Sequence, residues 1–224
     1  MMLKPSEKLA YWVGVAQSDG YFKKYRSKAT KNILYWLSLD VSESSLPMLK
    51  KFQVLSTKLF SRNASIFKRG TRHVWSYHIG IGKLLPIFER LDISFSCQPK
   101  PPLWCRGEPK FLGAYLAGLI DGDGDIRIKR KRYPQCVVRI TSGFRQLELA
   151  KTIRETLQCS VSIISRKGER VLKGRKIHGA WSEMEFYVSS KNHELIKQFV
   201  LPHLMLLYKK VKLETFIGSK WSSA

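Results

Sequence analysis

The stretch Gly113-Ala-Tyr-Leu-Ala-Gly-Leu-Ile-Asp-Gly-Asp-Gly-Asp-Ile126 closely matches an earlier one, Leu9-Ala-Tyr-Trp-Val-Gly-Val-Ala-Gln-Ser-Asp-Gly-Tyr-Phe22. A shift of 104 residues superposes Ala10 on Ala114, Tyr11 on Tyr115, Gly14 on Gly118, Asp19 on Asp123 and Gly20 on Gly124. Five identities in so short a window indicate an internal repeat, and a repeat determines the architecture of the whole chain.

The sequence that follows each copy is also repeated. Each motif precedes a basic extended segment, an apolar strand-like run, a helical pattern, a second pair of extended segments and a closing helix, so each half is predicted to be αββαββα. Four prolines (Pro99, Pro101, Pro102 and Pro109) separate the halves, since proline cannot continue a helix or a central strand. We expect an N-terminal half over 1–97, a linker over 98–110 and a C-terminal half over 111–224. The expected helices after the motifs are 46–60, 83–91, 147–157, 193–199 and 204–217, and the expected strands lie within 21–41, 66–81, 126–141 and 161–188.

Small residues four positions apart mark one face of each motif helix, predicted over 9–18 and 112–122. Residues at this spacing share a face, and glycine inside a helix costs roughly 0.5–1 kcal/mol relative to alanine, so equivalent glycines predict close helix packing. The residues expected at this interface are Ala10, Gly14, Ala114 and Gly118. If the two helices pack together, Asp19 and Asp123 lie side by side at their C-terminal ends.

The position of these two aspartates predicts a bound cation. Taken singly, either Asp-Gly pair fits an ordinary turn. A helix C-terminus carries partial negative charge, however, and two neighbouring carboxylates repel each other further, so a repeated pair needs compensation. Hard oxygen ligands suit Mg²⁺, which serves phosphodiester chemistry. Asp121-Gly-Asp-Gly-Asp125 is no calcium-binding EF-hand loop, because Ile126 and Arg132 occupy its glycine and glutamate positions.

Leu116-Ala-Gly-Leu-Ile-Asp-Gly-Asp-Gly124 resembles the signature of the LAGLIDADG homing endonucleases and departs from it only at Gly122, where the motif has alanine. The first copy, Trp12-Val-Gly-Val-Ala-Gln-Ser-Asp-Gly20, is a looser match that keeps the glycine, the final aspartate and the apolar spacing. With the repeated pattern, the resemblance covers nearly the whole chain. It implies an α+β saddle of two antiparallel β-sheets in the major groove of DNA, with the two motif helices packed at its centre.

The resemblance also implies the ligands of the metal. Asp19 and Asp123 would be catalytic and would hold divalent metal across the scissile phosphates, with the backbone carbonyls of Ser18 and Gly122 as further ligands. Mg²⁺ is the expected cofactor. Mn²⁺ is expected to substitute for it, and Ca²⁺ is expected to support binding without cleavage.

Other polar residues would support cleavage in the same family. Lys83 and Lys191, where the last strand of each half meets the closing helix, would organise solvent and offset charge on the phosphate. Glu43 and Ser142 occupy a supporting position that often holds glutamine, so they depart from the family's pattern.

The charge of the chain predicts a nucleic-acid partner. Its 40 Lys and Arg against 17 Asp and Glu give a formal net charge of +23, and phosphate contacts dominate nucleic-acid affinity. Residues 21–32, 62–73, 125–139 and 166–176 hold 21 of these 40 basic residues but only two acids, Asp125 and Glu169. We expect DNA contacts from Lys23, Lys24, Arg26, Lys28, Lys31, Arg62, Lys68, Arg69, Arg72, Arg127, Lys129, Arg130, Arg132, Arg139, Arg166, Lys167, Arg170, Lys173 and Arg175.

Several protein classes are excluded or disfavoured by the sequence. The sequence has no apolar run of about 18 residues, so no membrane-spanning segment is expected. The N-terminal residues also lack the apolar stretch that is typical of a secretory signal. The cysteines (Cys97, Cys105, Cys136 and Cys159) form no Cys-x-x-Cys pair, so reduced structural thiols are expected rather than zinc ligands. An intracellular protein is expected, in an archaeal cytoplasm, a chloroplast or a mitochondrion.

The resemblance therefore implies a monomeric, intron-encoded enzyme that makes Mg²⁺-dependent double-strand breaks at a long asymmetric site in double-stranded DNA. Two alternatives stay open. The same scaffold serves RNA-binding maturases, which would bind intron RNA. It also serves non-catalytic DNA-binding regulators, which typically lose the motif acids that this chain keeps.

Overall fold

The computed structural model describes residues 3–27, 31–70, 73–95, 99–130, 132–143, 145–172 and 175–219, and the side chains of 169–178 are not described. The first half contains α1 (Glu7–Ser18), β1 (Gly20–Arg26), β2 (Ile33–Ser42), α2 (Leu46–Phe60), β3 (Ile66–Lys68), β4 (Val74–Gly80) and α3 (Leu85–Arg90). The second contains α4 (Pro109–Asp123), β5 (Gly124–Lys129), β6 (Gln135–Ser142), α5 (Leu147–Leu157), β7 (Val161–Leu172), β8 (Arg175–Val188), α6 (His193–Phe199) and α7 (Leu207–Ile217).

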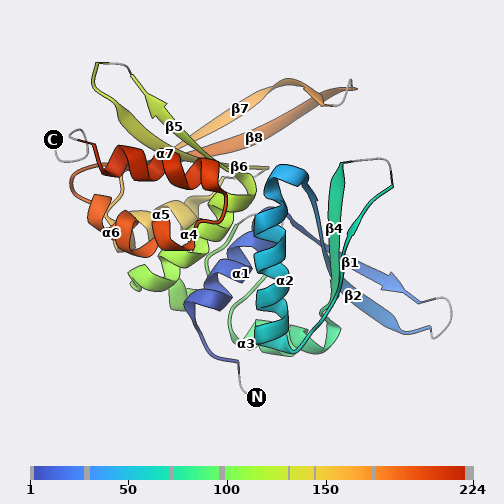
Figure 1. The fold of residues 1–224 in the computed structure, drawn as a ribbon. Coiled ribbons are helices and arrows are strands. Elements are labelled where there is room, and N and C mark those ends of the chain that lie inside the picture. The colour runs from blue at the N-terminus through green and yellow to red at the C-terminus, as the bar shows by residue number, and fades with distance from the viewer. Residues whose placement is uncertain are drawn as a thin grey trace.

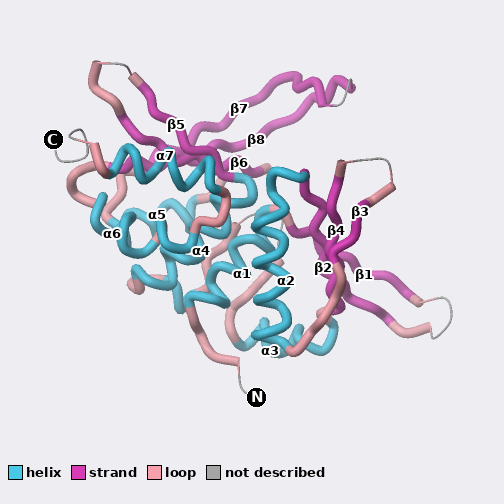
Figure 2. The backbone as a smooth tube through the Cα atoms, in the orientation of Figure 1, coloured by secondary structure: helices cyan, strands magenta, loops and turns pink. Residues whose placement is uncertain are grey.

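Both halves form the same kind of sheet. The strand orders are β1-β2-β4-β3 and β5-β6-β8-β7, and all paired strands are antiparallel. The predicted α+β fold with an αββαββ pattern in each half is confirmed. In Figures 1 and 2, α1 and α4 lie between the two sheets, and the hairpins β1–β2 and β7–β8 extend beyond the helical core.

Helix boundaries differ from the expected ones by a few residues: α1 begins at Glu7 rather than 9, and α3 begins at Leu85 rather than 83, after a 3-10 turn at Gly82–Leu84. Two further differences have reasons in local chemistry. α4 begins at Pro109, inside the linker predicted over 98–110, because the first turn of a helix does not need the amide hydrogen that proline lacks. α7 begins at Leu207 rather than 204, because a short 3-10 turn at Leu201–His203 ends in extended backbone at Leu204.

The helices cover one face of each sheet and leave the other open. Along β2, Leu37, Leu39 and Val41 belong to the hydrophobic core, and the two residues between them are polar: Ser38, which is also buried, and Asp40, which is partly exposed. In the second sheet, Ile126, Val138, Ile140, Met184 and Phe186 form the buried face. This alternation is that of strands with one face on a core, so the intervening residues of each strand lie on the open face.

An aromatic cluster fills the core of the first half. The Trp12 ring stacks on Phe52 with centroids 4.9 Å apart and on Phe88 with centroids 5.7 Å apart. The Trp12 indole N–H donates to the Ser56 hydroxyl oxygen over 2.8 Å, so its single polar atom is paired in the core.

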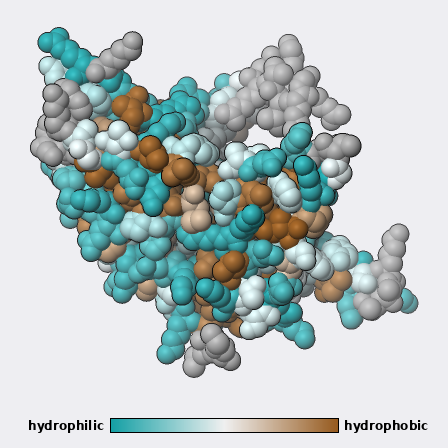
Figure 3. All heavy atoms as spheres, viewed as in Figure 1, coloured by the Kyte–Doolittle hydropathy of each residue, from teal (hydrophilic) through white to brown (hydrophobic). Residues whose placement is uncertain are grey.

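Most of the face seen in Figure 3 is hydrophilic, with smaller apolar patches over α7 and beside α2.

The central helices meet at two glycines. A Cβ atom at Gly14 would overlap the Tyr115 carbonyl oxygen, and one at Gly118 would overlap the Tyr11 carbonyl oxygen. The built Cβ of either glycine lies 3.1 Å from the Cα of the other, so the two backbones touch here. Ala10 and Ala114, also expected at this interface, are fully buried. Close packing of α1 on α4 thus explains why glycine stands inside both helices.

Substitution of Gly118 by Ala should destabilise the protein by about 1–3 kcal/mol or more, because the added methyl forces two helix backbones apart. Gly80→Ala is the matched control, since a Cβ there meets no atom within 4 Å; its effect should stay within about 0.5 kcal/mol. Urea unfolding of both variants checks this. Equal stabilities would show that the helices do not need this contact.

Candidate cleavage site between two open sheets

Asp19 and Asp123 lie at equivalent helix ends. Asp19 follows the last residue of α1, and Asp123 is the last residue of α4. The two ends are close, because a Cβ built at Gly122 would lie 3.2 Å from Asp19 Oδ2 and would overlap the Ser18 hydroxyl oxygen. Alanine, which the family motif has at Gly122, would therefore require Ser18 to shift. The structure brings together the four residues predicted as metal ligands.

Two tyrosines tie the helix pair together in a symmetric way. The Tyr11 hydroxyl of α1 donates to Asp121 Oδ2 of α4 over 2.7 Å. The Tyr115 hydroxyl of α4 donates to Gln17 Oε1 of α1 over 2.6 Å. Each acceptor stands two residues before the motif aspartate of its helix, so each tyrosine fixes the end of the opposite helix.

A reciprocal cap joins α4 to α7. The Asp121 carboxylate accepts the backbone N–H groups of Met205 and Leu206, at 2.8 and 3.1 Å, just before α7 begins. In return, the Lys209 ammonium of α7 donates to the Ile120 carbonyl, to the Asp121 carbonyl over 3.0 Å and to the Gly122 carbonyl over 3.3 Å. These carbonyls end α4, where a positive charge is favourable. Lys209 thus brings a buried cation to the aspartates.

Burial dominates the electrostatics of this centre. It raises the pKa of Asp19 to about 7, with the Asp123 charge adding to the rise and Lys209 opposing it. The Asp123 side chain keeps solvent contact, yet the surrounding protein still raises its pKa while Lys209 lowers it. Burial lowers the pKa of Lys209, against the raising effect of the nearby aspartates. Burial therefore disfavours the ionised form of both aspartates, and Lys209 opposes this only in part.

The expected supporting residues lie at opposite ends of their sheets. Glu43 directly follows β2, at the end where β2 pairs with the start of β4, whereas Lys83 follows the other end of β4. These ends are six residues apart along β2, or about 20 Å at the rise of a β-strand. Gly20, next to Asp19, pairs midway between them. Ser142 and Lys191 are arranged likewise in the second sheet.

The open face of the first sheet is centred on Asp40. Its carboxylate accepts hydrogen bonds from the Tyr21 hydroxyl (3.2 Å), the Ser76 hydroxyl (2.6 Å) and Arg69 Nη1 (2.8 Å). The Lys23 ammonium lies 4.6 Å from the centre of the Tyr21 ring. This face therefore combines two basic residues with hydroxyl and aromatic groups.

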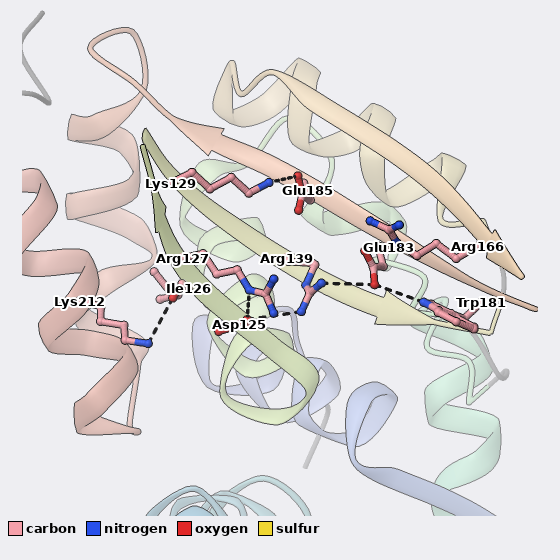
Figure 4. A network of polar contacts seen from close by, with 10 residues as sticks. All are labelled: Asp125, Ile126, Arg127, Lys129, Arg139, Arg166, Trp181, Glu183, Glu185 and Lys212. Carbon is pink, nitrogen blue, oxygen red and sulfur yellow. Dashed lines mark hydrogen bonds and ion pairs between the residues drawn. The ribbon is translucent and has the colours of Figure 1, made fainter. Parts of the chain in front are cut away.

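The open face of the second sheet carries an alternating network of charges (Figure 4). Arg139 forms ion pairs with Asp125 at 3.5 Å and with Glu183 at 3.3 Å, and Arg166 forms one with Glu183 at 2.9 Å. Lys129 pairs with Glu185 at 2.7 Å. The sequence analysis found only two acids in the basic segments. It did not predict that Asp40, Glu183 and Glu185 lie on the open faces, because they stand on β2 and β8, which carry no excess of basic residues.

The other expected DNA contacts are spread over both sides of the sheets. Lys24 lies 5.8 Å from the Tyr35 ring and Lys68 lies 5.8 Å from the Trp75 ring, on the side of the core. Alternation places Arg26 and Lys167 on that side of their strands as well. Lys31, Arg130 and Arg132 lie in the hairpin loops, and Arg62 follows α2. Lys28, Arg72 and Lys173 lie outside the described residues, as do the side chains of Arg170 and Arg175.

Other candidate chemistry finds no support in the described structure. Cys105, Cys136 and Cys159 are buried free thiols whose pKa values burial raises, while Cys97 lies outside the described residues. Three or more His, Cys, Asp or Glu side chains nowhere cluster as metal ligands among the described residues. Within the same ranges, no helix is long and apolar enough to cross a membrane.

Comparisons with known proteins agree with this architecture. Residues 110–200 match the LAGLIDADG-like domain family. The structure is similar to that of I-DmoI in complex with DNA and calcium, at 16% identity and a TM-score of 0.58, over 93% of this chain and 97% of I-DmoI. It is also similar to I-SmaMI bound to cleaved DNA, at 15% identity and a TM-score of 0.50, over 98% and 93% of the two chains. No curated protein matches the sequence.

Residues 110–200 therefore resemble a LAGLIDADG-like domain, and the whole chain has the fold seen in the solved structures of I-DmoI and I-SmaMI. The resemblance expected from the two motifs is confirmed, as is the single chain with two motif helices.

Asp19→Asn should stabilise the metal-free protein more at pH 8 than at pH 5. The folded protein keeps the Asp19 proton up to a pKa of about 7, whereas the unfolded chain releases it near 3.8, so stability falls as pH rises through that window. One pKa unit corresponds to about 1.4 kcal/mol, so the gain at pH 8 should reach a few kcal/mol. Urea unfolding with EDTA at both pH values measures it.

Asp125→Asn provides a control in which stability at pH 8 should change in the opposite direction. Burial of Asp125 favours its neutral form, but the hydrogen bond and charge of Arg127, with the charge of Arg139, lower its pKa overall. Its ionised form therefore stabilises the fold at pH 8, and Asp125→Asn should reduce stability there. A gain from Asp19→Asn that is the same at both pH values would contradict this account.

Proposed function

We propose that this protein is a site-specific DNA endonuclease that makes a double-strand break at a long asymmetric target. The observation that carries the proposal is the position of Asp19 and Asp123, two adjacent carboxylates at the ends of paired helices, between two sheets with open polar faces. A protein that only binds phosphate has no use for two acids at this position. The DNA complexes of the similar structures support the same assignment.

The residues present fit a divalent metal ion. The candidate donors are oxygens, from the Asp19 and Asp123 carboxylates and the Ser18 and Gly122 carbonyls, and hard divalent cations prefer such donors. Burial raises the pKa of both carboxyl groups despite the opposing charge of Lys209, and a bound cation would favour their ionised forms. Bound metal would polarise the scissile phosphate and lower the pKa of an attacking water. Mg²⁺ is proposed, and the DNA complexes of I-DmoI with calcium and with manganese support divalent metal in this fold.

The chain's own residues orient and balance this centre. Lys209 holds the last carbonyls of α4, including that of Gly122, and partly offsets the charge of the aspartates. Tyr11 and Tyr115 fix the ends of the two helices relative to each other. Lys83 and Lys191 are proposed to hold phosphate and solvent on the two sides, since both are exposed after the last strand of their half.

The two halves are chemically different, which supports an asymmetric target. The first open face presents Tyr21, Lys23 and Arg69 around one acid, Asp40, whereas the second presents alternating arginines and acids. Only identical halves would require a palindromic site. Because one chain supplies both aspartates, a monomer is proposed to cut both strands, and an intron is proposed to encode it.

Selection of cleaved sites from a randomised DNA library with Mg²⁺ tests the function directly. The expected result is one long, non-palindromic consensus that is cut on both strands, with Ca²⁺ giving binding without cleavage. Binding that shows no sequence preference, or no cleavage with any divalent cation, would contradict the proposal. Splicing of an intron RNA without DNA cleavage would favour the maturase alternative.

Asp19→Asn and Asp123→Asn should each abolish double-strand cleavage while Ca²⁺-supported DNA binding stays within a few-fold. Each substitution removes a charged ligand without changing side-chain size, so the DNA-facing sheets keep their structure. Strand-resolved cleavage of the selected site, with binding measured in parallel, checks this. Lys8→Met, on the exposed surface of α1, is a control for loss of a charge elsewhere. Full cleavage by either Asn variant would refute the metal assignment.

A further inference from the structure

Five charged side chains form a continuous chain across the open face of the second sheet (Figure 4). In spatial order they are Arg127, Asp125, Arg139, Glu183 and Arg166. Arg127 and Asp125 stand on β5, Arg139 on β6, Glu183 on β8 and Arg166 on β7, so the chain crosses all four strands. Positive and negative groups alternate along it, beginning and ending with an arginine.

Exposure varies along this chain. The Glu183 side chain is 5% exposed and that of Arg139 is 19% exposed, whereas those of Asp125, Arg127 and Arg166 are 40%, 46% and 49% exposed. Arg139 uses Nη2 for Asp125 and Nη1 for Glu183, so it bridges the two acids at the floor of the face. Glu183 is held further by the Trp181 indole N–H at 3.2 Å. The inner groups therefore neutralise one another and brace the outer two.

The outer arginines bind their acids in the same manner. Arg127 donates Nε–H to Asp125, and Arg166 donates Nε–H to Glu183 over 2.9 Å. Among the described residues, the terminal nitrogens of Arg127 and Arg166 make no other hydrogen bond or ion pair. A guanidinium held at Nε leaves its two terminal nitrogens available as a donor fork, and its orientation is restricted before binding.

This fork matches one base edge in the major groove. Guanine presents two acceptors there, O6 and N7, and a bidentate arginine is the commonest specific contact to them. Arginine held in place before binding loses less side-chain freedom when it contacts a base. Resting on the proposed function, we propose that Arg127 and Arg166 each read a guanine in the half-site bound by the second sheet, with Glu183 and Asp125 as positioning residues that aim them.

Arg166 is the sharper test, because it stands far along the sheet from Asp123. The probe is a randomised DNA library bound in Ca²⁺, with sequencing of the bound fraction for the unmodified protein and for Arg166→Lys. Lysine keeps the charge but loses the fork. The expected result is a guanine preference at one position that falls roughly ten-fold or more in Arg166→Lys, while the other positions keep their preferences. Arg127→Lys should remove the preference for guanine at a different position of the same half-site.

Glu183→Gln tests the positioning role separately. It leaves Arg166 in place but removes the charge that holds it, so guanine preference at the Arg166 position should fall several-fold. Lys167→Ala is the matched control, since Lys167 is adjacent in sequence but faces the other side of β7; it should leave the guanine preference unchanged. Unchanged base preference in the half-site bound by the first sheet would show that each variant is folded.

Two results would overturn the proposal. One is an unchanged guanine preference in Arg166→Lys and Glu183→Gln. The other is an even loss of affinity over all sequences in Arg166→Ala with a reduced dependence on salt, which would make Arg166 a phosphate contact. If the unmodified protein selects no DNA sequence, the proposed function fails and the guanine contacts fail with it. Selective binding with unchanged preferences in the variants would refute the guanine contacts alone.

Discussion

The backbone contact between α1 and α4 at Gly14 and Gly118 is the constraint on which the rest of the structure depends. Two helices can approach this closely only where neither carries a side chain, and both glycines stand at the same position of their repeat. The contact sets how far apart the helix ends lie, and hence the separation of Asp19 and Asp123. Because a sheet continues from each aspartate, it also sets how the two open faces sit relative to each other (Figure 1).

The symmetry of this helix pair is broken where each half connects to other parts of the chain. Gln17 and Asp121 are equivalent by the repeat, and both accept a hydrogen bond from a tyrosine of the opposite helix. Gln17 then binds the segment between the halves, through the Ser94 carbonyl and the Lys100 amide. Asp121 instead accepts the Met205 N–H just before α7, and Lys209 of α7 donates to the Ile120 carbonyl near the end of α4. The α4 end therefore gains a cation that α1 lacks.

Much of the fold could be predicted because local patterns repeat. The helices α2, α5 and α6 have the bounds expected from their periodicity. The close contact of α1 and α4 at Gly14 and Gly118 could also be predicted, from the spacing of small residues along each helix. Lys209 could not be predicted, because α7 has no counterpart in the first half and its contact spans 87 residues. The pairing of Arg139 with Glu183 was hidden for a similar reason. It depends on the register of β6 against β8, and a shift of one residue would place Glu183 on the core face.

Packing of α1 on α4 places the carboxylates of Asp19 and Asp123 together, and these are proposed to hold metal against DNA. Anomalous diffraction from crystals of the protein bound to its selected DNA with Mn²⁺ tests this most directly. The account predicts manganese peaks in contact with the carboxylates of both Asp19 and Asp123. Peaks located only elsewhere, or on one aspartate with the other bound to protein alone, would contradict it.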